Sequence, residues 1–568
     1  MHDRRRVRVF CYATTAADGS AHRAKIEREA GVFVACAAWP TQRIVERIAA
    51  DGIHVLVNLN GYTKGARNEI FAARPAPVLV AFMGFAGTLG AGWCDYVVAD
   101  PVVCPPWTVR SEVRAGRRRR LAAAAAAAAA QGAQGPRPPP PLDFGELDPE
   151  EDAGAWVYTE RMIYMPHTYF VNDHRQGFRE DDELRALAAA PGDALWRAEQ
   201  DARHRMRREL FPQLGDGVFI FANFNQLYKI DPQLFRLWLR ILERAPSAVV
   251  WLLRFPAAGE DHLRRVAREW AGDAVAARLV FTDVAPKHMH IKRGRIADAF
   301  LDTTECNAHT TAVDILWSGT PVLTWPRHEH KLCSRVAASV VCAAVGADAG
   351  QMVVGDAEAY VDRAVRWATE ATYTYEYAYP PADAAPAPAP ALDAAPAAAP
   401  MRGILDPDPQ TGLVQHKLCG GPAMDLRFRL FMQRDQSRLF DTQRWTRNLE
   451  RGLEEAWRRW VAGDDDLIEE EDCDGRDDWD GRDGRDDWDG RDGRDDRDDR
   501  DDCDLIGDDV QRRVEWSRWI EDDIAECLAK DPKAPVFAPP GRSIWVCDED
   551  DAMPAQTWVR EMLAWNKD

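Results

Sequence analysis

The sequence predicts an α/β protein with two units, each built on a parallel sheet. Short apolar segments typical of buried strands alternate with amphipathic segments typical of helices near the start of the chain, and the alternation returns after residue 216. Of the 568 residues, 46% are hydrophobic, which is enough to bury several cores. This apolar content excludes collagen-like and wholly disordered proteins.

The first predicted unit comprises residues 1–103 and 157–175. Its strands are expected over residues 6–12, 52–58, 77–82 and 96–100, with a helix over 43–50, and order is expected to resume at residues 161–165. Such alternation favours a parallel sheet with helices on both faces. Residues 104–156 interrupt the pattern with runs of arginine, alanine and proline, and they are predicted to form a poorly ordered insertion. An alanine helix over 121–130 is the local alternative.

The second predicted unit, residues 216–375, follows a connection between the units over residues 176–215. Its strands are expected over residues 218–222, 249–253, 279–281, 299–301 and 321–324. Its helices are expected over residues 232–244, 260–270, 287–295 and 310–317. Asp231 and Pro232 form a typical helix start, because aspartate caps a first turn and proline suits its first position.

Four further segments complete the predicted organisation. They are a linker rich in proline and alanine (376–436), a long helix after a short loop (437–463), an acidic disordered repeat (464–507) and a helical appendage of unknown role (508–568). Residues 464–504 hold 23 Asp and Glu residues and 7 Arg residues, a net of −16 out of −20 for the whole chain. Most of the acidity therefore belongs to one segment, and the balance argues against nucleic acid as the main ligand.

The acidic segment contains a nine-residue repeat that begins at Asp474. Its spacing matches neither an EF-hand loop nor the glycine-rich calcium repeat, so a solvated acidic spacer is favoured over a calcium site. His328 and His330 form an isolated HxH pair, which is more typical of a polar loop than of a metal site. We therefore expect no metal and no cofactor.

The composition also indicates the cellular compartment in which the protein is expected to work. No run approaches the ~18 apolar residues of a membrane-spanning helix, and no apolar segment follows the basic start of the chain. The 12 cysteines include no CxxC pair, so neither a zinc site nor a disulfide framework is favoured. The sequence is thus expected to work in the cytoplasm or the nucleus, without a membrane.

The strongest local motif spans residues 306–314, between a predicted strand and a predicted helix. Free N–H groups at a helix start bind anions, and the hydroxyls of Thr310 and Thr311 would add donors. Asp314 falls one turn into the helix, where its carboxylate could accept hydrogen bonds from a ribose. A simple N-cap by Thr310 or Asn307, without any ligand, is an equally open interpretation.

Two other motifs follow strands of the same unit. Lys229 lies in the segment 224–232, at the edge of the sheet where α/β folds bind ligands, and it could neutralise a departing diphosphate. In the segment 284–290, His290 could stack on a base while Ala285 offers backbone groups to the base edge. Taken singly, each segment is better explained by a solvated helix start without a ligand.

In the first unit, the segments 58–67 and 83–90 follow strands and are rich in glycine. Glycine allows the backbone to approach a sugar or phosphate closely. Such turns are common after strands, so each signal is weak by itself.

Taken together, these segments resemble the catalytic region of the protein O-linked N-acetylglucosamine (O-GlcNAc) transferases. The matching motifs, in order, lie at residues 51–69, 74–77, 164–168, 223–232, 251–256, 285–290, 306–311 and 334–339. The resemblance covers residues 6–103, 157–174, 216–370 and 437–463. It implies a GT-B fold, with two Rossmann-like lobes and UDP-GlcNAc between them.

The resemblance also implies an activity and a set of site residues. The activity is inverting, metal-independent transfer of GlcNAc from UDP-GlcNAc to Ser/Thr hydroxyls of nuclear and cytoplasmic proteins. By match, Lys229 would hold the diphosphate beside Gln226, and His309, Thr310 and Thr311 would surround the phosphates. The remaining matches would contact the ribose (Lys287, Asp314), the uracil (His290, Ala285) and the sugar side (Lys64, Gly65, Met83, Gly84). Lys229 and Lys64 are the predicted catalytic residues.

The sequence also departs from the family pattern. The tetratricopeptide repeats and the opening strand and loop of the catalytic region, which carry acceptor-side groups, have no match here. Ala308 and Ala312 stand where the family usually has glycine, and Ala86 where it has proline. A UDP-sugar-binding protein without transfer activity is therefore the alternative function, and a scaffold that acts through its acidic tail is a third.

Overall fold

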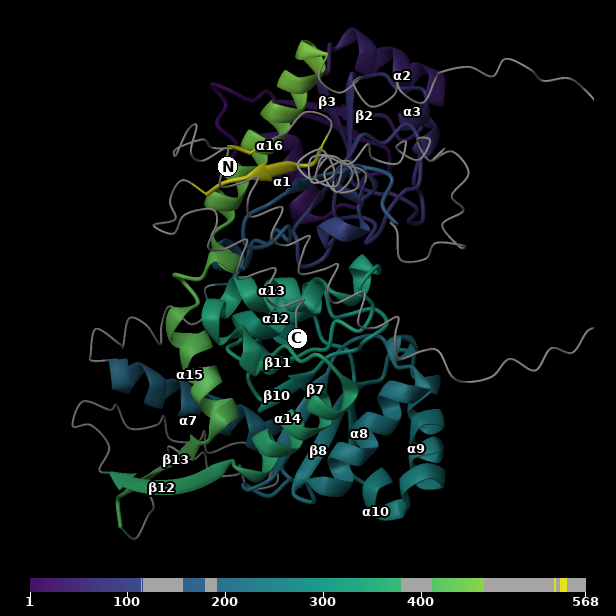
Figure 1. The fold of residues 1–568 in the computed structure, drawn as a ribbon. Coiled ribbons are helices and arrows are strands. Elements are labelled where there is room, and N and C mark those ends of the chain that lie inside the picture. The colour runs from purple at the N-terminus through teal and green to yellow at the C-terminus, as the bar shows by residue number, and fades with distance from the viewer. Residues whose placement is uncertain are drawn as a thin grey trace, which may run out of the picture. The chain divides into compact units, whose positions relative to one another are not determined.

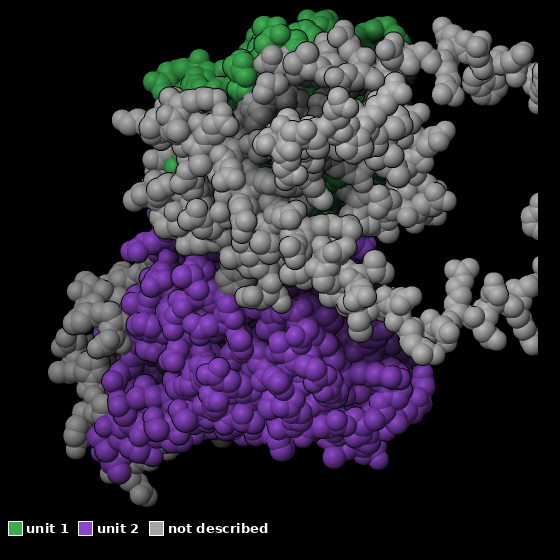
Figure 2. Space-filling model, viewed as in Figure 1, with its two compact units in different colours: residues 1–169, 445–568 green, residues 170–444 purple. Residues whose placement is uncertain are grey.

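The computed structural model describes residues 1–113, 115, 157–178, 192–378, 411–463, 536–537 and 542–548. The chain forms two compact units, which Figures 1 and 2 show. Unit 1 comprises Met1–Tyr169 and Trp445–Asp568, and unit 2 comprises Phe170–Arg444. The predicted acidic repeat, the alanine tract and most of the proline-rich linker lie outside the described residues.

Unit 1 contains a six-stranded sheet with the order β14-β15-β6-β5-β4-β3. Its strands are β3 (Val55–Asn58), β4 (Val78–Ala81), β5 (Tyr96–Ala99), β6 (Arg161–Tyr164), β14 (Val536–Phe537) and β15 (Ile544–Val546). All neighbours from β15 to β3 are parallel, and the pairs β3–β4 and β4–β5 join strands that the sequence predicted. A separate parallel pair joins β1 (Phe10–Ala13) to β2 (Val32–Ala35). The helices are α1 (Ala21–Glu29), α2 (Thr41–Ala50), α3 (Asn68–Ala72) and α16 (Thr442–Ala462).

The end of the chain contributes to this sheet, which differs from the predicted helical appendage over 508–568. Strand β15 pairs with β6, with Ile544 opposite Ile163, and its three residues are buried. Ser543 Oγ accepts a hydrogen bond of 3.1 Å from the Met162 N–H. Three apolar residues are too short a signal to identify a strand, so this pairing could not be predicted from the sequence pattern.

The insertion after β5 also begins later than predicted. Cys104 and Val109 are buried, and Val109 forms a bridge to Tyr158. A short 3₁₀ turn, η1 (Pro106–Thr108), lies between them. The predicted insertion is therefore wrong for residues 104–113, because apolar side chains of this segment are buried.

Unit 2 is built on a five-stranded parallel sheet with the order β11-β10-β7-β8-β9. Its strands are β7 (Phe219–Asn223), β8 (Ala248–Leu253), β9 (Leu279–Thr282), β10 (Ala299–Leu301) and β11 (Val322–Leu323), all close to the predicted ranges. The chain runs outward from β7 to β9, then returns to the other side of β7 to form β10 and β11. The carboxyl ends of β7 and β10 therefore flank a topological switch point, where open α/β sheets bind ligands.

Helices cover this sheet, as Figure 1 shows. They are α7 (Gly192–Leu210), α8 (Pro232–Arg244), α9 (Ala258–Ala271), α10 (Asp273–Ala276), α11 (Lys287–Gly294), α12 (Thr310–Trp317), α13 (Val336–Val345), α14 (Ala357–Thr369) and α15 (Pro422–Gln433). Helix α8 begins where the sequence predicts, since Asp231 caps it by accepting the N–H groups of Gln233 and Leu234. Its apolar face, including Trp238 and Leu242, is buried.

The predicted linker over 376–436 differs from the structure at both ends. Strands β12 (Thr372–Ala378) and β13 (Val414–Gly420) form an antiparallel pair, and α15 follows. The sequence of β12 alternates tyrosine with smaller or polar residues, which is a strand pattern. The neighbouring run of proline and alanine obscured it.

Candidate functional site

At the switch point of unit 2, the segment 223–229 at the end of β7 meets the 302–309 loop that follows β10. Three side chains of the first segment donate hydrogen bonds to the end of β10 and to this loop. Asn223 Nδ2 donates to the Leu301 carbonyl at 2.6 Å, and Asn225 Nδ2 donates to Thr303 Oγ1 at 2.8 Å. Lys229 Nζ donates to the Asn307 carbonyl at 2.8 Å. Lys229 ends the 3₁₀ turn η3 (Leu227–Lys229), and Gln226 precedes it. The structure thus brings Lys229 to the 306–311 motif, while Gln226 lies three residues before Lys229 in the chain.

Asp302 and Asn307 shape the 302–309 loop from inside. The buried Asp302 carboxylate accepts the N–H groups of Ala308 at 2.7 Å and Thr303 at 2.8 Å, together with the Thr324 hydroxyl at 2.8 Å. Asn307 Nδ2 donates to the Thr303 carbonyl at 2.6 Å, and Asn307 Oδ1 accepts the Ala337 N–H at 3.2 Å. The sequence analysis did not single out Asp302, although an aspartate directly after a buried strand was a usable signal.

The start of α12 carries no side-chain cap, which contradicts the interpretation of Thr310 or Asn307 as a simple N-cap. The N-cap residue is His309, and the Asn307 side chain is used within the loop. Helix α12 itself begins at Thr310, where it was predicted. Thr310 is exposed and Thr311 is half-buried. The first turn therefore offers N–H groups and two hydroxyls to an anion.

His309 is held toward the neighbouring turn η4 (Leu332–Ser334). A 3.0 Å hydrogen bond joins His309 Nε2 to the Cys333 carbonyl, and the Asn307 N–H donates to the same oxygen at 2.8 Å. These bonds hold the loop against η4, in addition to the bond from Lys229 to the Asn307 carbonyl. The loop is thus supported on both flanks before any ligand binds.

Asp314 lies one turn into α12, between two histidines. Its Oδ1 is 2.6 Å from His174 Nε2, and its Oδ2 is 4.0 Å from His290 Nε2. The His290 ring packs edge-to-face against Phe224, with ring centres 5.3 Å apart. Burial lowers the pKa of His290, which keeps the imidazole neutral and suited to stacking on a base. His174 was not recognised from the sequence, because nothing in its local pattern points to α12.

Lys287 is the first residue of α11, and Ala285 lies in the loop just before it. Lys287 Nζ is 5.1 Å from the centre of the Phe178 ring, and the lysine is otherwise exposed. Ala285 is half-buried in the preceding loop. His290, Lys287 and Ala285 therefore share one helix start, as the sequence predicted.

The sugar-side residues of the prediction lie in unit 1, on two loops that touch each other. A Cβ atom on Gly84 would lie 1.8 Å from the Leu59 carbonyl oxygen, and one on Gly61 would lie 2.2 Å from Phe85 Cβ. Met83 has a φ of 61°, a left-handed conformation that is rare outside glycine. Lys64 and Gly65 are exposed on the other loop. Glycine at 61 and 84 is what lets the two backbones approach.

The HxH segment is not isolated. Glu305 accepts from His328 Nε2 at 2.6 Å, from Lys331 Nζ at 2.7 Å and from Arg327 at 3.1 Å. Burial acts to raise the pKa of Glu305, but its partners outweigh this and hold the pKa at about 2. Within the described residues, no group of three or more His, Cys, Asp or Glu side chains is arranged to hold a metal ion. Likewise, none of the described helices has the length and apolar character needed to cross a membrane.

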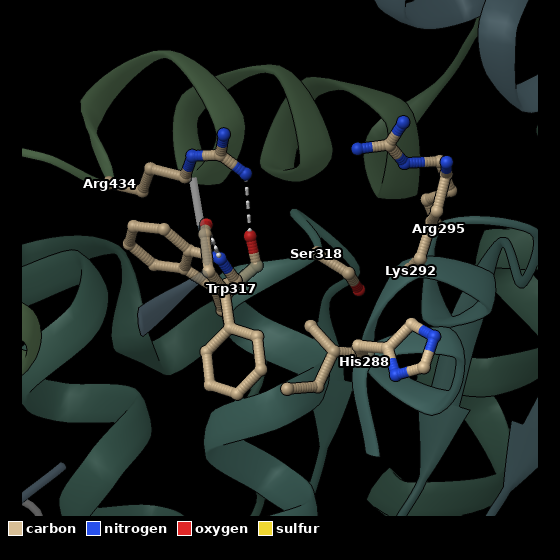
Figure 3. A pocket seen from close by; sticks show the side chains of 8 residues that line it. His288, Lys292, Arg295, Trp317, Ser318 and Arg434 are labelled. Carbon is tan, nitrogen blue, oxygen red and sulfur yellow. Dashed lines mark hydrogen bonds between the residues drawn. The ribbon is translucent and has the colours of Figure 1, made fainter. Parts of the chain in front are cut away.

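A shallow pocket elsewhere in unit 2 contains none of the predicted donor-binding residues. It is lined by Phe178, His288, Ile291, Lys292, Arg295, Trp317, Ser318 and Arg434. Figure 3 shows the Arg434 guanidinium turned to the Trp317 carbonyl, to which it donates at 2.9 Å. Arg295 lies 3.5 Å from the Glu199 carboxylate. Two of its basic groups are therefore already engaged within the protein.

Asp302 gives the site a pH-dependent stability. Burial raises the pKa of its carboxyl to about 7, from 3.8. In the folded protein, the Asp302 carboxyl therefore stays protonated up to a pH of about 7, whereas in the unfolded chain it loses its proton near pH 3.8. The resulting stabilisation is complete below pH 4 and is lost as the pH rises through about 7.

We expect wild type to lose stability relative to Asp302→Asn as the pH rises from 5 to 7. The slope should approach roughly 1.4 kcal/mol per pH unit, because one proton is involved. Chemical denaturation at several pH values measures it. A stability difference that does not change with pH contradicts the prediction.

The sequence model of a family described as Glycosyl transferase family 41 matches residues 1–113 and 197–378, just over half of the chain. A protein of Arabidopsis thaliana, named "Probable UDP-N-acetylglucosamine--peptide N-acetylglucosaminyltransferase SEC", is 39% identical over 368 residues, which are 65% of this chain and 30% of that protein. A UDP-N-acetylglucosamine--peptide N-acetylglucosaminyltransferase of Caenorhabditis elegans is 30% identical over 551 residues, with 82% of this chain and 39% of that protein covered. This chain thus spans about a third of the length of these relatives.

Among solved structures, an O-GlcNAc transferase of Thermobaculum terrenum is similar, with a TM-score of 0.51 at 19% identity. The likeness covers 80% of this chain and 62% of that one. It concerns the fold alone, and it confirms the predicted class, a GT-B type with two Rossmann-like units and parallel sheets.

Proposed function

Because the chain belongs to glycosyl transferase family 41, we propose that it transfers N-acetylglucosamine from UDP-GlcNAc to Ser/Thr hydroxyls of proteins. The observation that carries this proposal is the junction of Lys229 with the 302–309 loop, beside the uncapped start of α12. This junction lies at the switch point of the unit 2 sheet, where nucleotides bind in such folds. The names of the relatives support UDP-N-acetylglucosamine as the donor and a peptide as the acceptor.

In the proposed complex, the diphosphate lies against Lys229 and the first turn of α12. The Lys229 ammonium, the α12 amides and the Thr310 and Thr311 hydroxyls are all donors, and phosphate oxygens accept from each of them. Gln226 borders the same place. Lys229 already donates to the Asn307 carbonyl at 2.8 Å, which leaves its other two N–H groups for phosphate.

The nucleoside end would extend toward α11. Neutral His290, supported by Phe224 at 5.3 Å, stacks on the uracil, and the backbone of Ala285 meets its edge. Asp314 Oδ2, which faces His290, accepts a hydrogen bond from a ribose hydroxyl, because Asp314 Oδ1 is already 2.6 Å from His174 Nε2. Lys287, on the first turn of α11, reaches the same ribose.

The proposed chemistry is a direct displacement at the anomeric carbon, with inversion. The bond to UDP breaks as the acceptor oxygen attacks, and negative charge develops on the departing diphosphate. Lys229 and the α12 dipole stabilise that charge, which is work that a divalent metal performs in other enzymes. Lys64, Gly65, Met83 and Gly84 are proposed to line the sugar, with Lys64 as the second catalytic lysine. No metal or other cofactor takes part in this proposal.

One experiment separates transfer from binding alone. The full chain is given UDP-GlcNAc with a labelled sugar and a serine-containing peptide, while calorimetry measures the affinity for UDP. We expect UDP to bind and the peptide to become labelled, and we expect both results also when a metal chelator is present. Binding without labelled peptide would support the UDP-sugar-binding alternative, and no binding would refute both. Loss of transfer with the chelator would refute metal independence.

A further inference from the structure

Two cysteines face each other at the edge of the candidate site. Cys306 lies in the 302–309 loop and Cys333 lies in η4, where Cys333 Sγ donates at 3.5 Å to the carbonyl of Glu305, the residue directly before Cys306. The Asn307 N–H donates to the Cys333 carbonyl at 2.8 Å, so the two backbones run side by side. Both cysteines are reduced and partly exposed. A disulfide needs Cα atoms roughly 4.4–6.8 Å apart, so it can form only between residues whose backbones lie side by side in this way.

The charges around the pair make the two sulfurs unequal. The hydrogen bond from Cys333 lowers the pKa of the Cys306 thiol, and the side chains of His309 and Lys229 lower it further. The same bond, with burial, raises the pKa of Cys333. The pKa of Cys306 is therefore the lower of the two, and Cys306 is the sulfur that ionises more readily. A partly exposed thiolate beside cationic groups is the environment of reactive cysteines.

We propose that Cys306 and Cys333 form a dithiol that hydroperoxides oxidise to an intramolecular disulfide, and that a nucleoside diphosphate bound at the same loop blocks this oxidation. The first half rests on the proximity of the two cysteines and on the cationic groups beside Cys306. The second half rests on the proposed function, because it requires the diphosphate to bind beside Lys229.

The reaction takes two steps. The Cys306 thiolate attacks one oxygen of the hydroperoxide, the O–O bond breaks, and the products are Cys306 sulfenic acid and, from hydrogen peroxide, hydroxide. Cys333 then attacks the Cys306 sulfur, its thiol proton joins the departing hydroxyl group, and water leaves as the disulfide forms. The two cysteines are oxidised by two electrons, and the hydroperoxide is reduced by two.

The diphosphate and the thiolate compete for the same cations. A diphosphate at Lys229 and the α12 start brings negative charge next to Cys306, which disfavours the thiolate and covers the loop. The coupling is reciprocal, so a thiolate at Cys306 must weaken diphosphate binding by the same factor. Bound nucleotide should therefore slow the first step of the oxidation.

The test exposes the reduced full chain to hydrogen peroxide, with and without saturating UDP, and maps disulfides by mass spectrometry of peptides. We expect a 306–333 disulfide in the absence of UDP, and a rate at least tenfold lower with UDP. Cys333→Ala should stop at a sulfenic acid on Cys306, which dimedone traps. Cys306→Ala should form neither product. Cys11→Ala is the matched control, because burial raises the pKa of Cys11 and its loss should change nothing.

The outcomes separate the two halves of the proposal. Absence of the 306–333 disulfide in wild type, while other thiols oxidise, refutes the dithiol. An unchanged rate at UDP concentrations that calorimetry shows to be saturating refutes the blocking. If UDP does not bind at all, the proposed function fails, while the disulfide arm still tests the pair by itself.

Discussion

Replacing Lys229 by alanine is expected to weaken UDP binding by roughly 10- to 150-fold. Loss of one charge-assisted contact costs about 1.5–3 kcal/mol, and about 1.4 kcal/mol corresponds to a factor of ten. The variant loses the phosphate contact and also the 2.8 Å bond that holds the Asn307 carbonyl. Transfer should fall at least as far, since the same charge stabilises the departing UDP. Calorimetry with UDP and the labelled-sugar assay measure the two losses.

Lys292→Ala is the matched control, because Lys292 is an exposed lysine of unit 2 outside the predicted donor site. It removes the same charge from the unit and should leave UDP affinity within about twofold. Raising the salt concentration should weaken UDP binding to wild type more than to Lys229→Ala, because the lost contact is ionic. Equal UDP affinity of wild type and Lys229→Ala would remove Lys229 from the site.

The sequence predicted unit 2 well because its strands are short apolar segments that alternate with strongly amphipathic helices. The helix predicted over 232–244 is α8, residue for residue, since Asp231 and Pro232 mark its start. The carboxyl-edge loops were then expected to converge, because parallel strands end at the same edge. Lys229 and the 306–311 motif do so through the bond to Asn307.

What the sequence missed depends on contacts between distant segments. Strand β15 becomes a strand by pairing with β6, nearly 400 residues earlier, and three apolar residues carry no signal of that. His174 meets Asp314 across 140 positions, and Cys333 meets Cys306 only after η4 folds beside the loop. Periodicity predicts which face of an element is buried, but it does not predict which distant residue lies against it.

Replacing Asp298 by alanine is expected to destabilise unit 2 by about 3–5 kcal/mol, because it leaves two buried arginines without their partner. The Asp298 carboxylate, 2% exposed, bonds to the Arg203 guanidinium and the Ile220 N–H and lies 3.5 Å from Arg207. Burial acts to raise the pKa of Asp298, but the two arginines outweigh it and hold the pKa below its usual value. This stabilisation is therefore present above pH 4 and is lost as the pH falls further.

Asp283→Ala is the matched control, since that carboxylate is 85% exposed and its 3.1 Å pair with Arg254 lies at the surface. Surface pairs contribute about 0–1 kcal/mol, so the two variants should differ by several-fold in their effect. Denaturant unfolding of the full chain gives the free energies, and hydrogen exchange in β7 assigns the loss to unit 2. If Asp298→Ala does not fold, Asp298→Asn retains the acceptor for Ile220 and removes only the charge. Equal stability of Asp298→Asn and wild type would show that the buried arginines do not need this carboxylate, and that the core of unit 2 rests on its apolar contacts.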